Sequence, residues 1–267
     1  MLLWLPDHST GFWISAICAV ILIGIAKAGF GAGVGVLATP LMALTMPVAE
    51  AAALLLPLLI ISDIFAVANY RFHFDRRNIK LMLPGAFVGI MLGGFFFGYF
   101  LGKEQVLKVG IGILSVAFVI FQLARSSIIG AIEKRRPHAA EGVVMGAIAG
   151  FTSTLAHAGE PPVVVYLLPQ KLSPTLFVGT TIIFFAFTNA VKLIPYGSLG
   201  LLRAGNFLTI ALLSPLCYIG IKLGAYLNRY FSETWFKRFV YAALFITGIQ
   251  LIVGKGLVAV FLHLVRG

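Results

Sequence analysis

Residues 150–162 read GFTSTLAHAGEPP, and they lie inside an apolar run from Gly142 to Leu168 that is long enough to span a bilayer. The two prolines donate no backbone hydrogen bond and Gly159 tolerates positive φ, so the pattern predicts that a transmembrane helix unwinds here. Unwound backbone at membrane depth occurs only where protein or a wet cavity surrounds it. We expect a helix that restarts after Pro162 to point its amide groups at a ligand.

The composition of the whole chain indicates a membrane protein. Of the 267 residues, 60% are hydrophobic and only 11% are charged, whereas about 25% of a soluble domain is charged. A span needs about 20 apolar residues, so the chain has room for about eight. The fold class that we predict is therefore all-α and polytopic, with about eight transmembrane helices.

The first apolar stretch, Gly11–Thr45, is too long for one perpendicular crossing, since a helix of that length measures roughly 50 Å. It must tilt, break or fold back, and the glycines of residues 29–35 together with Pro40 favour a break. We therefore expect a broken or re-entrant first segment. The other predicted spans are Ala49–Tyr70, Ile79–Leu101, Val106–Leu123, Gly142–Leu168, Pro174–Tyr196, Gly205–Asn228 and Trp235–Val253.

Internal matches predict two related halves. Asp63 corresponds to Asn189 at a separation of 126 positions (189 − 63), and residues 32–33 and 158–159, both Ala-Gly, have the same separation. We expect a first transmembrane repeat over 1–126, a cytoplasmic linker over 127–140 and a second transmembrane repeat over 141–267. In transporters built from repeats, the substrate site lies where the repeats meet.

Two short basic segments, 71–80 and 125–136, predict the cytoplasmic side. With one crossing per apolar run, which is the topology we expect, both termini are cytoplasmic and the repeats are parallel. That topology places Arg229, Lys237 and Arg238 outside, against the positive-inside rule. If the first run of each half crosses twice, the repeats become inverted instead.

The excess of positive charge, 20 Lys and Arg against 9 Asp and Glu, fits the loops of a membrane protein beside anionic lipid. No solvated basic face exists for a nucleic acid. Cys18 and Cys217 lie in separate apolar runs, so we expect neither a disulfide nor a metal site. No Walker motif occurs, and we expect no cofactor.

Ionisable residues inside the spans are costly, at about 2.5–3.5 kcal/mol each, and so mark functional positions. Asp63 fits either an ion pair with a lysine or a coupling role, and Lys192 and Lys222 fit either snorkelling to the interface or function. The three lysines against Asp63 and Glu160 leave one positive charge within the spans, and this charge suits the binding of a small anion. The ionisable residues that we single out within the spans are Lys27, Asp63, His157, Glu160, Lys192 and Lys222.

Several of these motifs together resemble the TauE/SafE family of membrane transporters. The resemblance rests on residues 27–33 (KAGFGAG), Leu56-Pro57-Leu58 with Asp63, and residues 150–162 continuing to Asn189. It implies a secondary-active anion transporter of the bacterial inner membrane, in a family named for sulfite and organosulfonate export. Glu160 departs from the family pattern, in which we expect glycine; it must be protonated or paired beside an anion.

We therefore expect a secondary transporter, not an enzyme, that exports a small sulfur-containing anion with protons. Its partners are that anion and the lipid bilayer of the cell membrane. A passive channel is an alternative, and so is an intramembrane hydrolase using Ser153 and His157, although no Gly-x-Ser-x-Gly elbow surrounds Ser153. Proton coupling is assigned to Glu160, Asp63 and His157, and substrate binding to Lys27, Gly31, Gly33, Thr152, Ser153, His157, Gly159, Asn189 and Lys192.

Overall fold

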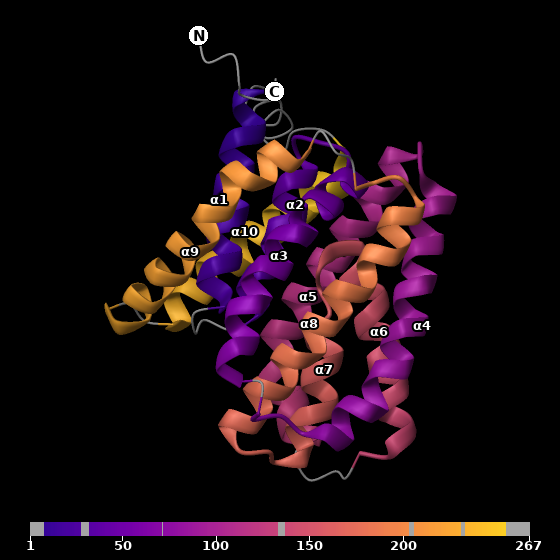
Figure 1. The fold of residues 1–267 in the computed structure, drawn as a ribbon, viewed down its shortest axis with the longest axis vertical. Helices are drawn as coiled ribbons and strands as arrows, with labels where there is room; N and C mark the ends of the chain where they lie inside the picture. Colours follow the sequence, from indigo (N-terminus) through magenta and orange to yellow (C-terminus); the bar gives the residue numbers. More distant parts are fainter. Residues whose placement is uncertain are drawn as a thin grey trace, which may run out of the picture.

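The computed structural model describes residues 8–27, 32–70, 72–132, 137–202, 206–230 and 233–254, and every regular element within them is a helix (Figure 1). Seven of the helices are long and apolar enough to cross a membrane, and α1 is a shorter apolar helix. The prediction of an all-α polytopic membrane protein is thus confirmed. The elements are α1 (Thr10–Ile25), η2 (Ala32–Leu37), α2 (Ala38–Ala43), α3 (Val48–Tyr70), α4 (Arg76–Phe100), α5 (Glu104–Ile132), α6 (Ala139–Ala156), α7 (Glu160–Leu167), η3 (Leu168–Gln170), α8 (Pro174–Ser198), α9 (Asn206–Tyr230) and α10 (Glu233–Val253).

The first apolar run folds back on itself. The Thr45 hydroxyl, just after α2, lies 2.8 Å from Ser15 Oγ in the second turn of α1. A Cβ on Gly11 would also touch the Thr45 methyl group, at 3.6 Å. The chain therefore returns to the level at which α1 began, and we call α1, η2 and α2 the first hairpin.

The second apolar run folds back in the same way. A Cβ on Gly142, near the start of α6, would lie 2.8 Å from the Tyr166 ring near the end of α7. Residues 157–159 form the turn between the two helices. We call α6 and α7 the second hairpin.

The two hairpins open toward opposite ends of α4 (Figure 1). The second hairpin opens at the start of α4, where Gly146 faces Met82. The first opens near the far end, where the Val48 amide donates to Glu104 Oε1 at 3.0 Å, just beyond α4. The expected topology of one crossing per run is therefore wrong, because each first run is too long for one crossing and turns back at a helix break.

Because of this arrangement, α3 and α8 run in opposite directions and contact each other (Figure 1). The order of elements, a hairpin followed by three long helices, is the same in α1–α5 and in α6–α10. This order fits an inverted relation between the halves and excludes the parallel one. The residue boundaries assigned above to the two repeats remain a prediction.

Glycines allow the hairpins to pack closely against single helices. A Cβ at Gly85 or Gly89 of α4 would collide with the backbone of α6, and a Cβ at Gly24 of α1 would lie 2.6 Å from the Cys217 carbonyl of α9. In lipid, helices associate through such close van der Waals packing rather than through hydrophobic burial. Each hairpin is thereby attached to a long helix of the other half.

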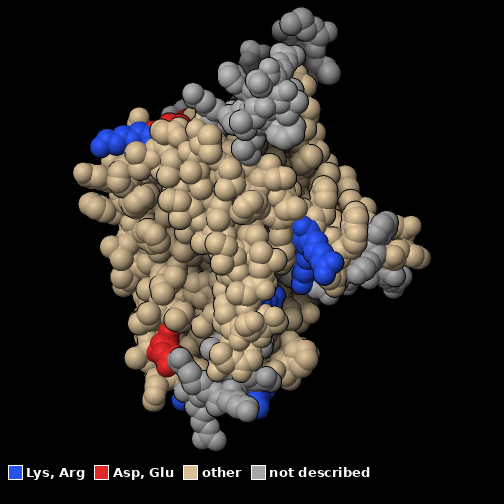
Figure 2. Space-filling model, turned by 180° about the vertical axis from the view of Figure 1, so that it is seen from behind, with Lys and Arg blue, Asp and Glu red and all other residues tan. Residues whose placement is uncertain are grey.

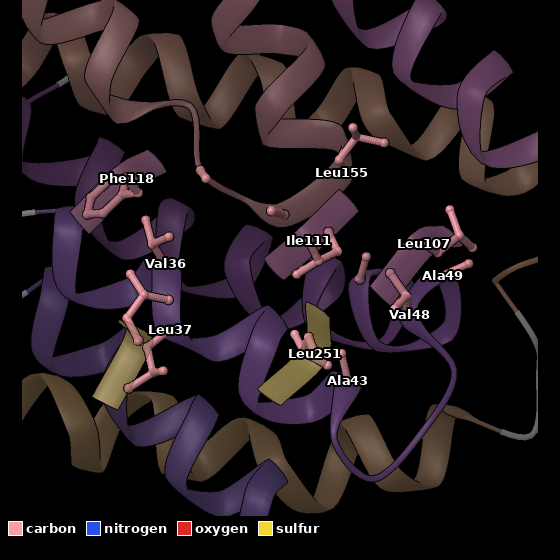
Figure 3. Close-up of a cluster of buried hydrophobic side chains, with 14 of the residues drawn as sticks. Val36, Leu37, Ala43, Val48, Ala49, Leu107, Ile111, Phe118, Leu155 and Leu251 are labelled. Atoms are coloured by element: carbon pink, nitrogen blue, oxygen red, sulfur yellow. The ribbon is translucent and has the colours of Figure 1, made fainter. Parts of the chain in front are cut away.

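An apolar cluster lies behind the hairpin turns, against α5 and α10 (Figure 3). It combines side chains of η2 and α3 with the end of α6, so it connects the two hairpins to the same pair of long helices. This packing brings the two hairpins together. Its members include Val36, Leu37, Val48, Ile111, Phe118, Leu155 and Leu251.

Several basic residues lie at the end of the molecule where α4 begins, and other Lys and Arg side chains lie elsewhere on the surface (Figure 2). α10 runs antiparallel to α5, with Phe118 beside Tyr241 and Gly112 beside Ile252, so the start of α10 lies beside the end of α5. Much of the surface between the two ends is uncharged (Figure 2). The residues at this basic end, where α4 begins and the second hairpin opens, are Arg76, Arg77, Lys80 and Lys171.

Candidate functional site

A cavity of ≈ 60 Å³ lies between the two hairpin turns, where α3 and α8 cross. Its polar lining comes from Lys27 at the end of α1, from the turn of the second hairpin and from α8. Its apolar lining comes from both hairpins, from α3 and from α8. The lining residues are Ile23, Ala26, Lys27, Gly35, Ala38, Leu59, Ser153, His157, Glu160, Phe185 and Asn189.

The first hairpin contributes a cation that is already paired. Lys27 Nζ donates to Asp63 Oδ1, and the Asn189 amide donates to Asp63 Oδ2 at 2.6 Å. Asp63 is only 3% exposed, so its charge is compensated by two donors from different halves of the chain. Asp63 and Asn189, which the sequence matched at a separation of 126 positions, are thus in direct contact.

In the second hairpin, α6 ends because His157 adopts the left-handed conformation, with φ 53° and ψ 29°. α7 begins at Glu160, so Pro161 and Pro162 lie in its first turn, where missing N–H groups cost nothing. The expectation that the helix restarts after Pro162 is therefore wrong by one turn. The break comes from His157 and the residues that follow it, before the prolines.

Lys192 and His157 are linked inside the protein. Lys192 is fully buried, and its Nζ lies 2.8 Å from His157 Nδ1, 3.1 Å from Ser153 Oγ and 3.2 Å from the Ser153 carbonyl. His157 Nε2 lies 3.1 Å from the Ala52 carbonyl, which can only accept, so Nε2 carries the proton and Nδ1 accepts from Lys192. The snorkelling alternative for Lys192 is excluded by its burial.

These contacts also bear on the hydrolase alternative. The Ser153 hydroxyl is bonded to Lys192, and both ring nitrogens of His157 are occupied by other partners. A nucleophile needs a hydrogen bond to its base, and no such bond joins Ser153 to His157 among the described contacts. The geometry therefore gives this alternative no support.

Glu160 lines the cavity, and neither Lys27 nor Lys192 forms a hydrogen bond with it among the described contacts. Its Oε2 atom is buried and accepts no hydrogen bond from the described residues. Lys27 donates to Asp63, and Lys192 to Ser153 and His157. A buried carboxylate oxygen without a donor is costly when charged, which makes Glu160 the least satisfied polar group of the site.

Other predicted residues lie near the cavity or outside the described chain. Thr152 donates its hydroxyl to the Ile148 carbonyl of its own helix, at 2.9 Å, and does not line the cavity. Gly159 precedes α7, and a Cβ there would lie 3.1 Å from both Ser153 and Phe185. Gly33 lies in η2, and Gly31 lies outside the described residues.

Lys222 does not belong to the site. It is exposed on α9, where its Nζ lies 5.5 Å from the Tyr218 ring centroid. The predicted balance of one positive charge counted this lysine and needs correction. Around the cavity, Lys27 and Lys192 face Asp63 and Glu160, and their formal charges cancel when all four are ionised.

Sequence reasoning missed the apolar part of the lining and the role of the Ala52 carbonyl. Leu59 and Phe185 belong to apolar helices in which many positions look alike. A backbone carbonyl that accepts a distant histidine leaves no signal in sequence.

Comparison with known protein families gives one match. Residues 16–251 match the family model described as Sulfite exporter TauE/SafE, and this range includes most of the first hairpin, all of the second and every residue that lines the cavity. No curated protein and no solved structure matches the chain.

Proposed function

Because the chain belongs to the sulfite exporter TauE/SafE family, a family of membrane transporters, we propose that it exports a small sulfur-containing anion by secondary-active transport coupled to protons. Sulfite or an organosulfonate is the expected cargo. The observation that carries the proposal is the cavity between the hairpin turns, which combines a lysine, an amide and a hydroxyl at membrane depth.

The polar lining offers hydrogen-bond donors to an oxyanion. Lys27 and the Asn189 amide stand on one side of the cavity and Ser153 on another, each held by a separate helix. Charge-assisted hydrogen bonds to oxyanions are the strong ones. A cavity of ≈ 60 Å³ is smaller than the roughly 150 Å³ that holds benzene, so an anion of a few heavy atoms fits best.

Movement of the anion follows from the architecture. The cavity lies between hairpins that open toward opposite ends, and each is packed on a long helix of the other half. Rocking one unit against the other would expose the site to each side in turn. Glu160, Asp63 and His157 lie at the same place and supply groups that can hold a proton.

The folded-back hairpins also support an orientation. In this topology the loop before α10 lies on the same side of the membrane as the loop before α4, so Lys237 and Arg238 no longer conflict with the positive-inside rule. The basic end then faces the cytoplasm of a cell with the protein in its inner membrane. Residues 8 and 254, at the two limits of the described chain, lie on the opposite side.

Sulfite efflux from proteoliposomes that contain the purified protein tests the proposal. We expect saturable efflux that a pH gradient alters and that Lys27→Met abolishes, whereas Lys222→Met, which changes a lysine outside the cavity, leaves it intact. Efflux that never saturates and ignores the pH gradient would indicate a channel. Absence of flux for every sulfur anion under all gradients would refute the proposal.

A further inference from the structure

Three acidic or basic groups were candidates for carrying the coupled proton, and the structure distinguishes among them. Both carboxylate oxygens of Asp63 are engaged, Oδ1 by Lys27 and Oδ2 by Asn189. Both ring nitrogens of His157 are engaged, by Lys192 and by the Ala52 carbonyl. A proton added to either group would break an existing bond between helices, so both suit a structural role.

Glu160 differs from these two groups. Its Oε2 is buried and accepts no hydrogen bond from the described residues, while the residue lines the cavity. A proton on this carboxyl breaks no contact seen in the structure, and it removes the cost of a buried charged oxygen that has no hydrogen-bond donor. Of the three groups, Glu160 is therefore the one that can gain and lose a proton without rearranging the helices.

The charges around Glu160 determine what this proton does. Lys27 just after α1, Lys192 on α8, Asp63 on α3 and Glu160 line the cavity or contact its lining, and their four formal charges cancel when Glu160 is ionised. The charges of Arg125 on α5 and Lys237 on α10 also act on Glu160. One proton on Glu160 leaves the four-residue set with one positive unit, which one monovalent anion neutralises.

We propose that Glu160 is the single proton carrier and that the protein moves one monovalent anion together with one proton, without net charge; this inference rests on the proposed function. The carboxylate takes the proton from water on the side from which the anion enters, and both leave on the other side. An ionised Glu160 repels the anion, so the two bind together. Export then proceeds only while the product of proton and anion concentrations is higher inside than outside.

The wild-type protein in proteoliposomes tests this directly, with methanesulfonate as a permanently monovalent probe and an entrapped pH-sensitive dye. We expect one proton to move with each anion, and a potassium diffusion potential to change the rate less than twofold. Anion flux without proton movement, or a rate that the potential changes tenfold, would overturn the inference and leave the proposed function standing. Absence of flux for any anion would refute the proposed function itself.

Glu160→Gln gives a second, independent test, because glutamine resembles the protonated carboxyl. We expect the variant to retain a rate of anion exchange within about threefold of wild type. The accumulation of anion that a pH gradient drives should fall at least tenfold. The matched control is Glu141→Gln, at the open end of the second hairpin and outside the cavity; it should behave as wild type. A Glu160→Gln protein that still accumulates anion in response to the pH gradient would refute the inference. If this variant does not fold, the measurement of protons and anions moved by the wild-type protein remains the test.

Discussion

The hairpin of α1, η2 and α2 brings one charged side chain to the cavity, whereas the hairpin of α6 and α7 brings a hydroxyl, an imidazole and a carboxyl. In the first hairpin, the Lys27 charge is met by Asp63. In the second, Ser153 and His157 share Lys192, and Glu160 keeps a buried oxygen without a donor. The two hairpins therefore differ in how completely their polar groups at the cavity are satisfied.

The difference indicates a division of labour between the hairpins. A satisfied ion pair is costly to disturb and holds its charge constant, while an unsatisfied carboxyl can change its charge cheaply. At the separation of 126 positions, Val34 stands where the second hairpin has Glu160, and Gly31 stands where it has His157. The first hairpin thus supplies a constant charge, and the second supplies the groups that vary.

The largest effect is expected from Lys27→Met, which tests whether the first hairpin holds the constant charge. The change removes a cavity cation and leaves Asp63 buried with one donor. Breaking a buried ion pair costs about 3–5 kcal/mol. We expect loss of sulfite efflux by at least 100-fold and a lower thermal unfolding temperature, measured on detergent-purified protein.

The double variant Lys27→Met with Asp63→Asn serves as the control for this prediction. It removes both charges, so the unfolding temperature should return most of the way to wild type while efflux stays lost. Recovery of efflux in the double variant would show that Lys27 serves only to neutralise Asp63. Its role as an anion ligand would then be refuted.

A smaller effect is expected from His157→Gly, which tests the second hairpin. Glycine adopts the positive φ of residue 157 without strain, so the change removes the ring and keeps the turn. The buried Lys192 then loses one of its acceptors, at a cost of about 1–3 kcal/mol. We expect efflux to fall by about 10- to 100-fold; efflux at the wild-type rate would contradict the importance of the Lys192–His157 contact.

The sequence was sufficient for the class of fold and for the existence of a break in each first apolar run, but it left the path of the chain open. Apolar length and the glycines of residues 29–35 predict a break, yet they do not tell a single crossing from a hairpin. That choice depends on contacts between distant helices, such as Gly146 against Met82. The violation of the positive-inside rule by Arg229, Lys237 and Arg238 was the one signal in the sequence for the hairpins.

The candidate site was predictable in its ionisable residues and not in their partners. Charge at membrane depth identified Lys27, Asp63, His157, Glu160 and Lys192, and these five lie around the cavity or in contact with its lining. Their pairing depends on side-chain geometry that spacing does not encode. For this reason the sequence left open whether Glu160 is protonated or paired with a lysine, whereas in the structure Lys27 bonds to Asp63 and Lys192 bonds to Ser153 and His157.

The packing of the two hairpins gives a further comparison through Gly89→Ala, Gly24→Ala and Gly110→Ala. A Cβ at Gly89 would collide with the α6 backbone, one at Gly24 would lie 2.6 Å from the α9 backbone, and one at Gly110 would meet open space. Overpacking costs about 1–3 kcal/mol, while Gly→Ala in an open helix gains about 0.5–1 kcal/mol. We expect the unfolding temperature to fall most for Gly89→Ala, less for Gly24→Ala, and to rise slightly for Gly110→Ala.

The smallest effect concerns Tyr70 near the end of α3 and Tyr196 near the end of α8, which are 126 positions apart (196 − 70). Tyr196 is fully buried and donates its hydroxyl to the Thr154 carbonyl near the end of α6, at 2.5 Å, whereas Tyr70 is half-buried with no hydrogen bond of its hydroxyl among the described contacts. A neutral hydrogen bond contributes about 1 kcal/mol. Tyr196→Phe should therefore lower the unfolding temperature by a few degrees, and Tyr70→Phe should leave it unchanged. Equal shifts in the two variants would mean that the second hairpin gains no stability from this bond, so that its turn is held by the His157 and Lys192 contacts alone.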